Sequence, residues 1–225
     1  MKTQIKKKNN NYKKSKKGGS LFKTFDKIDK IVYINLDSRK DRRKHIETQI
    51  KMMNVDKNKV LRFPAIFHEK GYIGCSKSHL EVIKMAKRNN WKNVLIFEDD
   101  FTFIQNIEEI KKKIDMFFKR ELDWNILMLA YNDWKLNDYD NNLKTCTYCG
   151  APSGYLVNNK FYDKLIENMS KSVNLLETGS SYNDGALDRV WFELQDKKWF
   201  VMYPRVGSQI KSYSDIEKRL VHYML

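Results

Sequence analysis

Short apolar runs alternate with amphipathic stretches along this chain, and that alternation limits the folds the chain can adopt. Residues 30–36 ("KIVYINL"), 93–97 ("NVLIF") and 124–130 ("WNILMLA") are apolar and rich in β-branched or large side chains. Residues 71–90, between the first two runs, repeat apolar side chains at helical spacing. Continuous apolar strands separated by helices predict an α/β domain with a mostly parallel central sheet and flanking helices.

The rest of the chain continues this pattern. Ser38 with Asp41, and Ser78 with Glu81, have the spacing of capping boxes and predict two helix starts. Pro64 predicts that its strand is short or lies at a sheet edge. Further strands are expected at residues 59–66, 154–158 and 199–204, and further helices at residues 108–122, 160–169 and 185–195.

The positive charge of the chain is concentrated at its start. Residues 1–20 hold eight Lys and no acid, out of a net charge of +15. Such a segment has too little apolar surface to offset its ordering entropy, so it is predicted to be a disordered tail. Residues 21–225 are long enough for one domain with a proper core.

Targeting signals and cysteine usage point to the cytoplasm. The chain shows no apolar signal-peptide region and no apolar stretch long enough to span a membrane. Three Cys, an odd and low number, argue against a disulfide framework and for a reducing compartment. The "CTYC" spacing at residues 146–149 would suit zinc only if Cys75 and His79 completed the ligand set.

Three carboxylates follow the strand at residues 93–97: Glu98, Asp99 and Asp100. Adjacent like charges repel, so a positive partner is expected. Ligands of parallel α/β sheets bind outside the carboxyl ends of the strands, and carboxylates are ligands for hard cations. The triplet therefore predicts a divalent cation carried with a nucleotide, although the acids would also suit a strand end that caps the next turn.

Four segments carry a resemblance to a known family: "IVYINLDSRKDRR", "GCSKSHLEVIKMA", "NVLIFEDDF" and the late "SDI" at residues 214–216. Together and in this order, over residues 29–217, they resemble glycosyltransferase family 25. That family includes bacterial lipopolysaccharide sugar transferases and the collagen galactosyl- and glucosyltransferases. The resemblance implies a GT-A-like fold.

The same resemblance implies a reaction. It is the inverting transfer of a hexose from a nucleotide sugar, usually a UDP-sugar, with Mn²⁺ or Mg²⁺. The acceptor would be a hydroxyl of a glycan, a lipid-linked sugar or a collagen-like protein. Neither the sugar nor the acceptor follows from the sequence.

The resemblance also assigns residues. Asp100 matches the position of direct metal contact, with Glu98 beside it, and Glu98 or Asp99 would hold ribose or a metal-bound water. The nucleotide-binding residues would be Asn35, Leu36, Asp37, Arg39, Arg42, Ser78 and His79. Arg39 and Arg42 would face the diphosphate because guanidinium pairs well with phosphate, unless they only begin a solvated helix. Ser78 and His79 are expected at a helix N-terminus that approaches an anion, although His79 would equally suit a structural hydrogen bond.

An inverting transfer needs a base that takes the proton of the acceptor hydroxyl. A carboxylate is the natural candidate, as in inverting glycosidases. Asp184 matches the family pattern and is ranked first, with Asp188 one turn further on. Each would otherwise be a helix cap or a surface acid.

Two other functions remain open. One is a degenerate family member that binds without catalysis. The other is a binder of polyanions or membrane surfaces acting through residues 1–20, because Lys-rich arms attract phosphates. The folded part shows no nucleic-acid-binding motif. Trp124, Tyr131 and Trp134 would form a stacking platform for an acceptor sugar or belong to the core.

Overall fold

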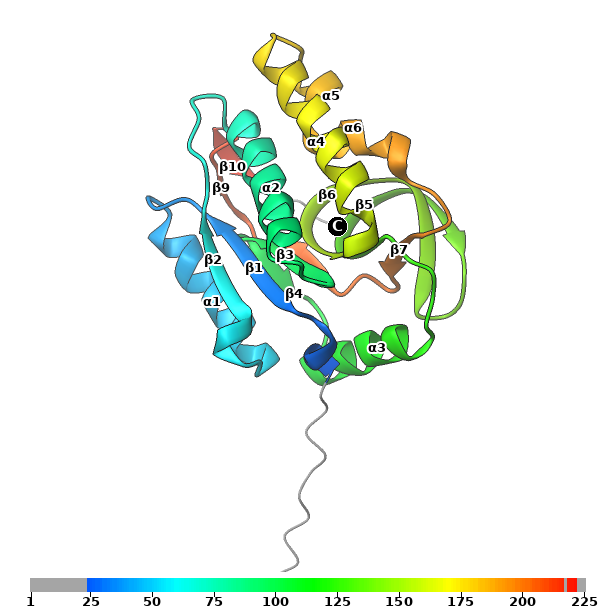
Figure 1. Cartoon of the computed structure of the whole chain (residues 1–225). Coiled ribbons are helices and arrows are strands. Elements are labelled where there is room, and N and C mark those ends of the chain that lie inside the picture. The colour runs from blue at the N-terminus through cyan, green and yellow to red at the C-terminus, as the bar shows by residue number, and fades with distance from the viewer. Residues whose placement is uncertain (1–23, 217, 222–225) are drawn as a thin grey trace, which may run out of the picture.

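The computed structural model describes residues 24–216 and 218–221. The predicted tail at residues 1–20 lies outside the described residues. Figure 1 shows a twisted central sheet with long helices packed against it. The sheet has six strands in the order β2-β1-β3-β6-β5-β7, and two smaller two-stranded sheets pair β4 with β8 and β9 with β10.

The two strands that precede the predicted site lie side by side inside the sheet. β1 (Lys30–Asn35) pairs in parallel with both β2 (Val60–Pro64) and β3 (Asn93–Glu98). β2 is the edge strand, as Pro64 predicts. The expectation that "KIVYINL" and "NVLIF" are interior and parallel is confirmed, so their carboxyl ends meet at one edge of the sheet.

One strand runs against its neighbours. β6 (Leu143–Asn158) is antiparallel to β3, to β5 (Ile126–Asp138) and to β7 (Trp199–Met202), whereas β5 and β7 are parallel. Only residues 139–142 separate β5 from β6, and a connection this short joins antiparallel strands. The sheet is therefore mixed, although β1, β2, β3, β5 and β7 share one direction.

Helices cover both faces of the sheet. α2 (Gly71–Arg88) and α4 (Tyr162–Glu177) contribute to one apolar cluster, and α1 (Lys40–Met53) and α3 (Ile107–Lys119) contribute to the other. Strand β1 supplies both clusters: Val32 and Ile34 join the first, and Ile31 and Tyr33 the second. This period-2 alternation explains why the strand is apolar throughout.

Short elements complete the chain. They are η1 (Thr24–Lys27), η2 (Lys57–Lys59), β4 (Phe101–Phe103), η3 (Asn159–Phe161), α5 (Tyr182–Gly185), α6 (Leu187–Val190), η4 (Trp191–Leu194), β8 (Gly207–Gln209), β9 (Ser212–Ser214) and β10 (Arg219–Val221). The helix expected at residues 185–195 is thus only the turn α6 followed by the 3-10 turn η4.

Both predicted capping boxes are wrong. Arg39 is the N-cap of α1 and makes no side-chain capping bond, so Ser38 caps nothing. Helix α2 begins at Gly71, and Ser78 lies two turns inside it. The hydroxyl of Ser78 donates to the Gly74 carbonyl, one turn earlier, and accepts a hydrogen bond from the Ile66 N–H.

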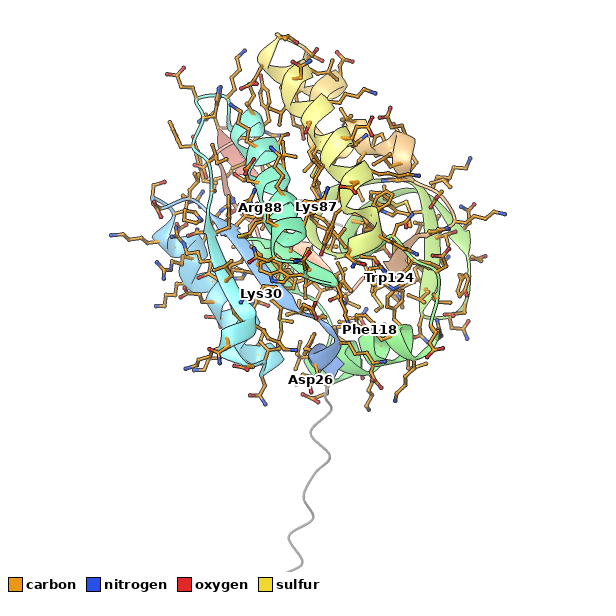
Figure 2. The ribbon with its side chains drawn as sticks, in the orientation of Figure 1. Asp26, Lys30, Lys87, Arg88, Phe118 and Trp124 are labelled. Carbon is orange, nitrogen blue, oxygen red and sulfur yellow. A yellow bond between two sulfur atoms is a disulfide. The ribbon has the colours of Figure 1, made fainter. Side chains whose placement is uncertain are left out.

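Of the two alternatives for the three aromatic residues, a sugar platform or the core, the structure places two of the residues in the core. Trp124 is buried in the core, with its ring packed edge-on against Phe117 and Phe118 of α3. Figure 2 shows the labelled Trp124 and Phe118 close to α3. Tyr131 is also buried, and its hydroxyl donates to the Met202 carbonyl. The side chain of Trp134 lies outside the described part.

Candidate active site

The acidic triplet is buried at the carboxyl end of β3. Asp99 and Asp100 are 7% and 6% exposed, and Glu98 is half-buried. Phe101 follows directly and is fully buried, so the chain cannot swing the acids out into solvent without losing core packing. Three neighbouring carboxylates held away from water need compensation from their surroundings.

Arg42 supplies part of the missing positive charge. It lies in the first turn of α1, and its Nη1 is 3.1 Å from Asp99 Oδ1 and 3.0 Å from Asp100 Oδ2. Its Nη2 donates to the Ser212 hydroxyl and the Tyr213 carbonyl. Its Nε is buried without a hydrogen-bond partner among the described residues. Arg42 is therefore part of the site and not of a solvated helix start.

Glu98 is held by groups on both of its oxygens. His79 Nε2 lies 3.2 Å from Oε1, and His79 Nδ1 lies 2.8 Å from the Tyr155 hydroxyl. Gln209 Nε2 donates to Glu98 Oε2 at 3.2 Å and to Asp100 Oδ1 at 3.3 Å. Gln209 carries no signal in the sequence; it reaches the triplet because β8 pairs with β4, the strand that begins at Phe101.

The loop after β1 approaches the triplet through Asn35. Its side-chain amide donates to Asp99 Oδ2 at 2.7 Å, and its Oδ1 accepts from Arg62 Nε. Leu36 also lines the pocket described below. Asp37 does not line it: its carboxylate is exposed and paired with Arg62 at 2.5 Å. The structure thus brings Asn35 and Leu36 to the site and leaves Asp37 at its periphery.

The electrostatics of the triplet favour an added cation. Burial, reinforced by the charge of Glu98 and opposed by Arg42, raises the pKa of Asp100 to about 7. Burial likewise raises the pKa of Asp99. Burial also acts to raise the pKa of Glu98, but the hydrogen bond and charge of His79 outweigh it, and the net shift is downward. One guanidinium faces three carboxylates, and these hard oxygen donors fit Mn²⁺ or Mg²⁺.

The triplet forms one wall of an open pocket of about 190 Å³. The loop after β1, the segment that enters α2, and the turn between β9 and β10 form the other walls. Polar side chains from all of these elements face it: Asn35, Ser38, Arg42, His68, Ser78, His79, Asp99, Asp100, Gln209, Ser214, Asp215 and Lys218.

Arg39 takes a different place from Arg42. It does not line this pocket, and its guanidinium bonds to Asp41, to Asp215 at 2.5 Å and to the Tyr213 carbonyl. Asp215 does line the pocket. Arg39 therefore ties the β9–β10 hairpin, which forms part of the pocket wall, to the start of α1.

Ser78 and His79 line the pocket but do not lie at a helix N-terminus. The expected binding mode is wrong because α2 starts at Gly71. Gly71 and Gly74, in the true first turn, also line the pocket. A Cβ at Gly74 would come within 2.3 Å of the Ile66 carbonyl oxygen, so the helix packs too closely against that loop to tolerate a side chain.

A second open pocket, of about 440 Å³, adjoins the first. Both pockets are lined by Cys75, Glu98, Gln209 and Ile216, so they meet at the triplet. The second pocket also has Tyr72 and Tyr182, whose ring centroids are 5.6 Å apart in an edge-to-face arrangement. The molecule thus offers two adjoining spaces that share one carboxylate.

The two candidate bases occupy different surroundings. Asp188 lines the second pocket, and its Oδ2 accepts a hydrogen bond from the Ala151 N–H. Burial raises the pKa of Asp188. Asp184 is exposed, lines neither pocket and bonds to Ser181, the N-cap residue of α5. The geometry favours Asp188 and leaves Asp184 as an exposed acid that accepts a hydrogen bond from the capping hydroxyl of Ser181, which reverses the ranking made from the sequence.

The remaining metal alternative from the sequence fails. Cys146 and Cys149 are joined in a disulfide with their Cα atoms 6.1 Å apart, so these sulfurs are not free zinc ligands. The disulfide was not expected from the low cysteine count. Cys75 is the free cysteine.

Comparison with solved structures supports the fold. A glycosyltransferase involved in glycosylation of the major capsid of PBCV-1 aligns with a TM-score of 0.52 and 10% identity, over 84% of this chain and 96% of that one. Two other solved structures align with TM-scores below 0.5. A197 from STIV aligns with a TM-score of 0.49 and 9% identity, over 85% of this chain and 93% of that one. A mannose-1-phosphate geranyltransferase from Thermus thermophilus aligns with a TM-score of 0.46 and 8% identity, over 79% of this chain and 74% of that one. A comparison with curated proteins finds no match.

The mixed α/β sheet, with an acidic triplet at the end of β3 beside two adjoining pockets, has a GT-A-like fold. The model of glycosyltransferase family 25 (LPS biosynthesis protein) matches residues 64–180, more than half of the chain. The chain belongs to that family. Among the described residues, no helix has the length and apolar character needed to cross a membrane.

Proposed function

We propose that this chain transfers a hexose from a UDP-sugar to a hydroxyl group of a glycan acceptor, with inversion at the anomeric carbon. The observation that carries the proposal is the meeting of two pockets at Glu98, one containing Asp99 and Asp100 and the other Asp188. A transfer reaction needs two substrate sites with a common boundary, and the reacting atoms would meet there.

The first pocket suits the donor. Asp100 and Glu98 would hold Mn²⁺ or Mg²⁺, which would neutralise charge on the departing diphosphate. Arg42 would contact the diphosphate with a guanidinium that is already desolvated and still has an unpartnered Nε among the described residues. Asp99 is held in place by Asn35 and Arg42, which leaves it suited to orienting a ribose hydroxyl or a metal-bound water.

The second pocket suits the acceptor and the base. Asp188 would take the proton of the acceptor hydroxyl while that oxygen forms its bond to the anomeric carbon. The bond from this carbon to the diphosphate oxygen breaks on the opposite face, and the diphosphate leaves with the electron pair. A raised pKa makes the carboxylate of Asp188 a stronger base than an exposed one.

The lining of the second pocket supports a sugar as the acceptor. Tyr72 and Tyr182 offer aromatic edges and faces together with hydroxyl groups, and Asn132 adds an amide. Sugar-binding surfaces combine apolar rings with hydrogen-bonding groups in this way because sugars have both kinds of surface. The association of the family with LPS biosynthesis agrees with a glycan acceptor.

The experiment has two stages. First, purified protein is screened for thermal stabilisation and hydrolysis with a panel of sugar nucleotides, with and without Mn²⁺; a UDP-sugar with Mn²⁺ should give the largest response. Second, transfer is measured for Asp188→Asn and for Asp184→Asn as the matched control. Asp188→Asn should lower transfer by about 10²–10⁴-fold and keep UDP binding. Asp184→Asn should stay within a few-fold of the wild type.

Other outcomes would redirect the proposal. Loss of transfer in Asp184→Asn alone would restore the sequence-based ranking. Donor binding without hydrolysis or transfer across a broad acceptor panel would instead favour a family member that binds without catalysis.

A further inference from the structure

A thiol, an imidazole and a carboxylate converge where the two pockets meet. Cys75 and His79 lie one turn apart on α2, and Glu98 ends β3. Cys75 Sγ is 3.6 Å from Glu98 Oε1, and His79 Nε2 is 3.2 Å from the same oxygen. The three ligand atoms lie within 4.8 Å of one another.

Two of these three separations match those of a tetrahedral zinc site. Zinc bonds of about 2.3 Å to sulfur and about 2.0–2.1 Å to nitrogen or oxygen, set at the tetrahedral angle, place sulfur and oxygen ~3.6 Å apart and nitrogen and oxygen ~3.3 Å apart. The observed 3.6 Å and 3.2 Å lie close to these values. The carboxylate oxygen of Glu98 therefore already lies at suitable distances from both of the other ligand atoms, which themselves lie within 4.8 Å of each other.

The surroundings of the cluster also suit zinc. His79 Nδ1 is hydrogen-bonded to the Tyr155 hydroxyl, and such an outer partner orients a metal-binding imidazole. His79 is fully buried, so the ring is held in one position. Sulfur and imidazole donors select zinc over Mg²⁺ or Mn²⁺, which prefer oxygen. Only Glu98 Oε1 faces this cluster, because Oε2 bonds to Gln209, which also bonds to Asp100.

We propose that Cys75, His79 and Glu98 form a binding site for Zn²⁺, which shares Glu98 with the site proposed for a hard cation at Asp100. Cys75 and Glu98 line both pockets, so the fourth position of the ion would be open to substrate or water. A consequence that rests on the proposed function is inhibition: Zn²⁺ bound to Glu98 would occupy the boundary that the donor and the acceptor share.

Co²⁺ tests the site because it replaces zinc and reports thiolate ligands by a charge-transfer absorption band. The full chain without thiol reductant should bind one equivalent of Co²⁺ with this band, and Zn²⁺ should abolish it. Cys75→Ser should remove the band and weaken Zn²⁺ binding by more than about 100-fold, since even outer partners of metal ligands contribute about 10–100-fold. Asp100→Asn and the double variant Cys146→Ala/Cys149→Ala should keep the band.

A second measurement avoids dependence on the folding of variants. In the wild type, Zn²⁺ should protect Cys75 from alkylation, with the modified residue identified by mass spectrometry. Absence of both the band and the protection would overturn the proposal, as would a band that survives in Cys75→Ser or disappears with Cys146 and Cys149. None of these readouts needs a donor or acceptor, so a failure of the proposed glycosyl transfer would leave them unaffected.

Discussion

The carboxyl of Asp100 destabilises the folded protein at neutral pH, because burial and the charge of Glu98 raise its pKa from 3.8 to about 7. A carboxyl with a raised folded pKa binds its proton more tightly in the native state. Its contribution to the free energy of unfolding therefore falls as pH rises from about 4 to about 7. At about 1.4 kcal/mol per pKa unit, the ionised group costs about 4 kcal/mol above pH 7.

Asp100→Asn keeps the shape of the side chain and removes this cost, while Arg42 keeps its bond to Asp99. In urea unfolding with EDTA, the variant should be more stable than the wild type at pH 8, by up to about 4 kcal/mol. The difference should shrink toward zero at pH 4. A variant that is less stable at pH 8, or a difference that does not change with pH, would show that Asp100 only caps a turn.

The same pair of proteins tests the metal. Mn²⁺ should raise the melting temperature of the wild type, and Mn²⁺ with UDP should raise it further, because only the folded state presents the site. Free ligand at 100 times its Kd adds about 2.7 kcal/mol to stability. Asp100→Asn should lose most of this gain and nearly all transfer. If the wild type melts at one temperature in EDTA, in Mn²⁺ and in Mn²⁺ with UDP, the metal–nucleotide interpretation of the triplet is refuted.

Two arginines give further predictions. Arg42→Gln leaves the buried acids without their guanidinium and should destabilise the protein by about 3 kcal/mol at pH 8 in urea unfolding, and by less at pH 5, where Asp100 is protonated. Equal losses at both pH values would contradict this. Arg39→Ala removes the partly exposed ion pair that joins the β9–β10 hairpin to α1, so calorimetry should show UDP binding weakened by about two- to fivefold. Asp215→Asn breaks the same ion pair and should weaken UDP binding to a similar extent. An unchanged Kd for UDP in both variants would show that the hairpin has no role in the donor pocket.

The sequence predicts the interior strands and the position of the triplet well, because both depend on local patterns. β1 and β3 are apolar on both faces and each ends in polar residues. The antiparallel direction of β6 cannot be predicted from such local patterns. "GYLVN" has the same apolar character whichever direction it runs, and only the four-residue connection to a long β5 decides the matter.

The partners of the triplet depend on contacts between distant residues and could not be read from local patterns. Arg42 lies 57 positions before Asp99, and Gln209 lies 111 positions after Glu98. The S-x-x-E pattern at Ser78 fits a cap in sequence alone, yet close packing of Gly74 against Ile66 lets the helix begin earlier. The sequence ranks Asp184 above Asp188; only their surroundings in the fold show that Asp188 lines a pocket and that Asp184 is exposed.

The position of the triplet depends on the ring that follows it. Phe101 is fully buried, and a Cβ built on Gly154 would lie 2.5 Å from its ring; a Cβ on Gly207 would lie 2.2 Å from it. Gly154 lies in β6, next to Phe97 of β3, so neither backbone can move aside without disturbing the sheet. The two glycines therefore make the slot that holds Phe101 and, through it, Asp100.

Gly154→Ala should overpack this slot, with a loss of about 1–3 kcal/mol in urea unfolding. It should also weaken binding of Mn²⁺ with UDP, because the displaced ring is adjacent in the chain to Asp100. Adding Phe101→Leu to Gly154→Ala removes ring atoms from the clash. The loss of unfolding free energy in the double variant should therefore be smaller than the sum of the two single losses, by at least about 1 kcal/mol. Gly179→Ala is the control for a glycine without close neighbours, although its positive φ of 100° adds a backbone penalty of its own. Strict additivity of Gly154→Ala and Phe101→Leu would mean that the ring and the glycine do not share this slot, and that the triplet is positioned by its hydrogen bonds alone.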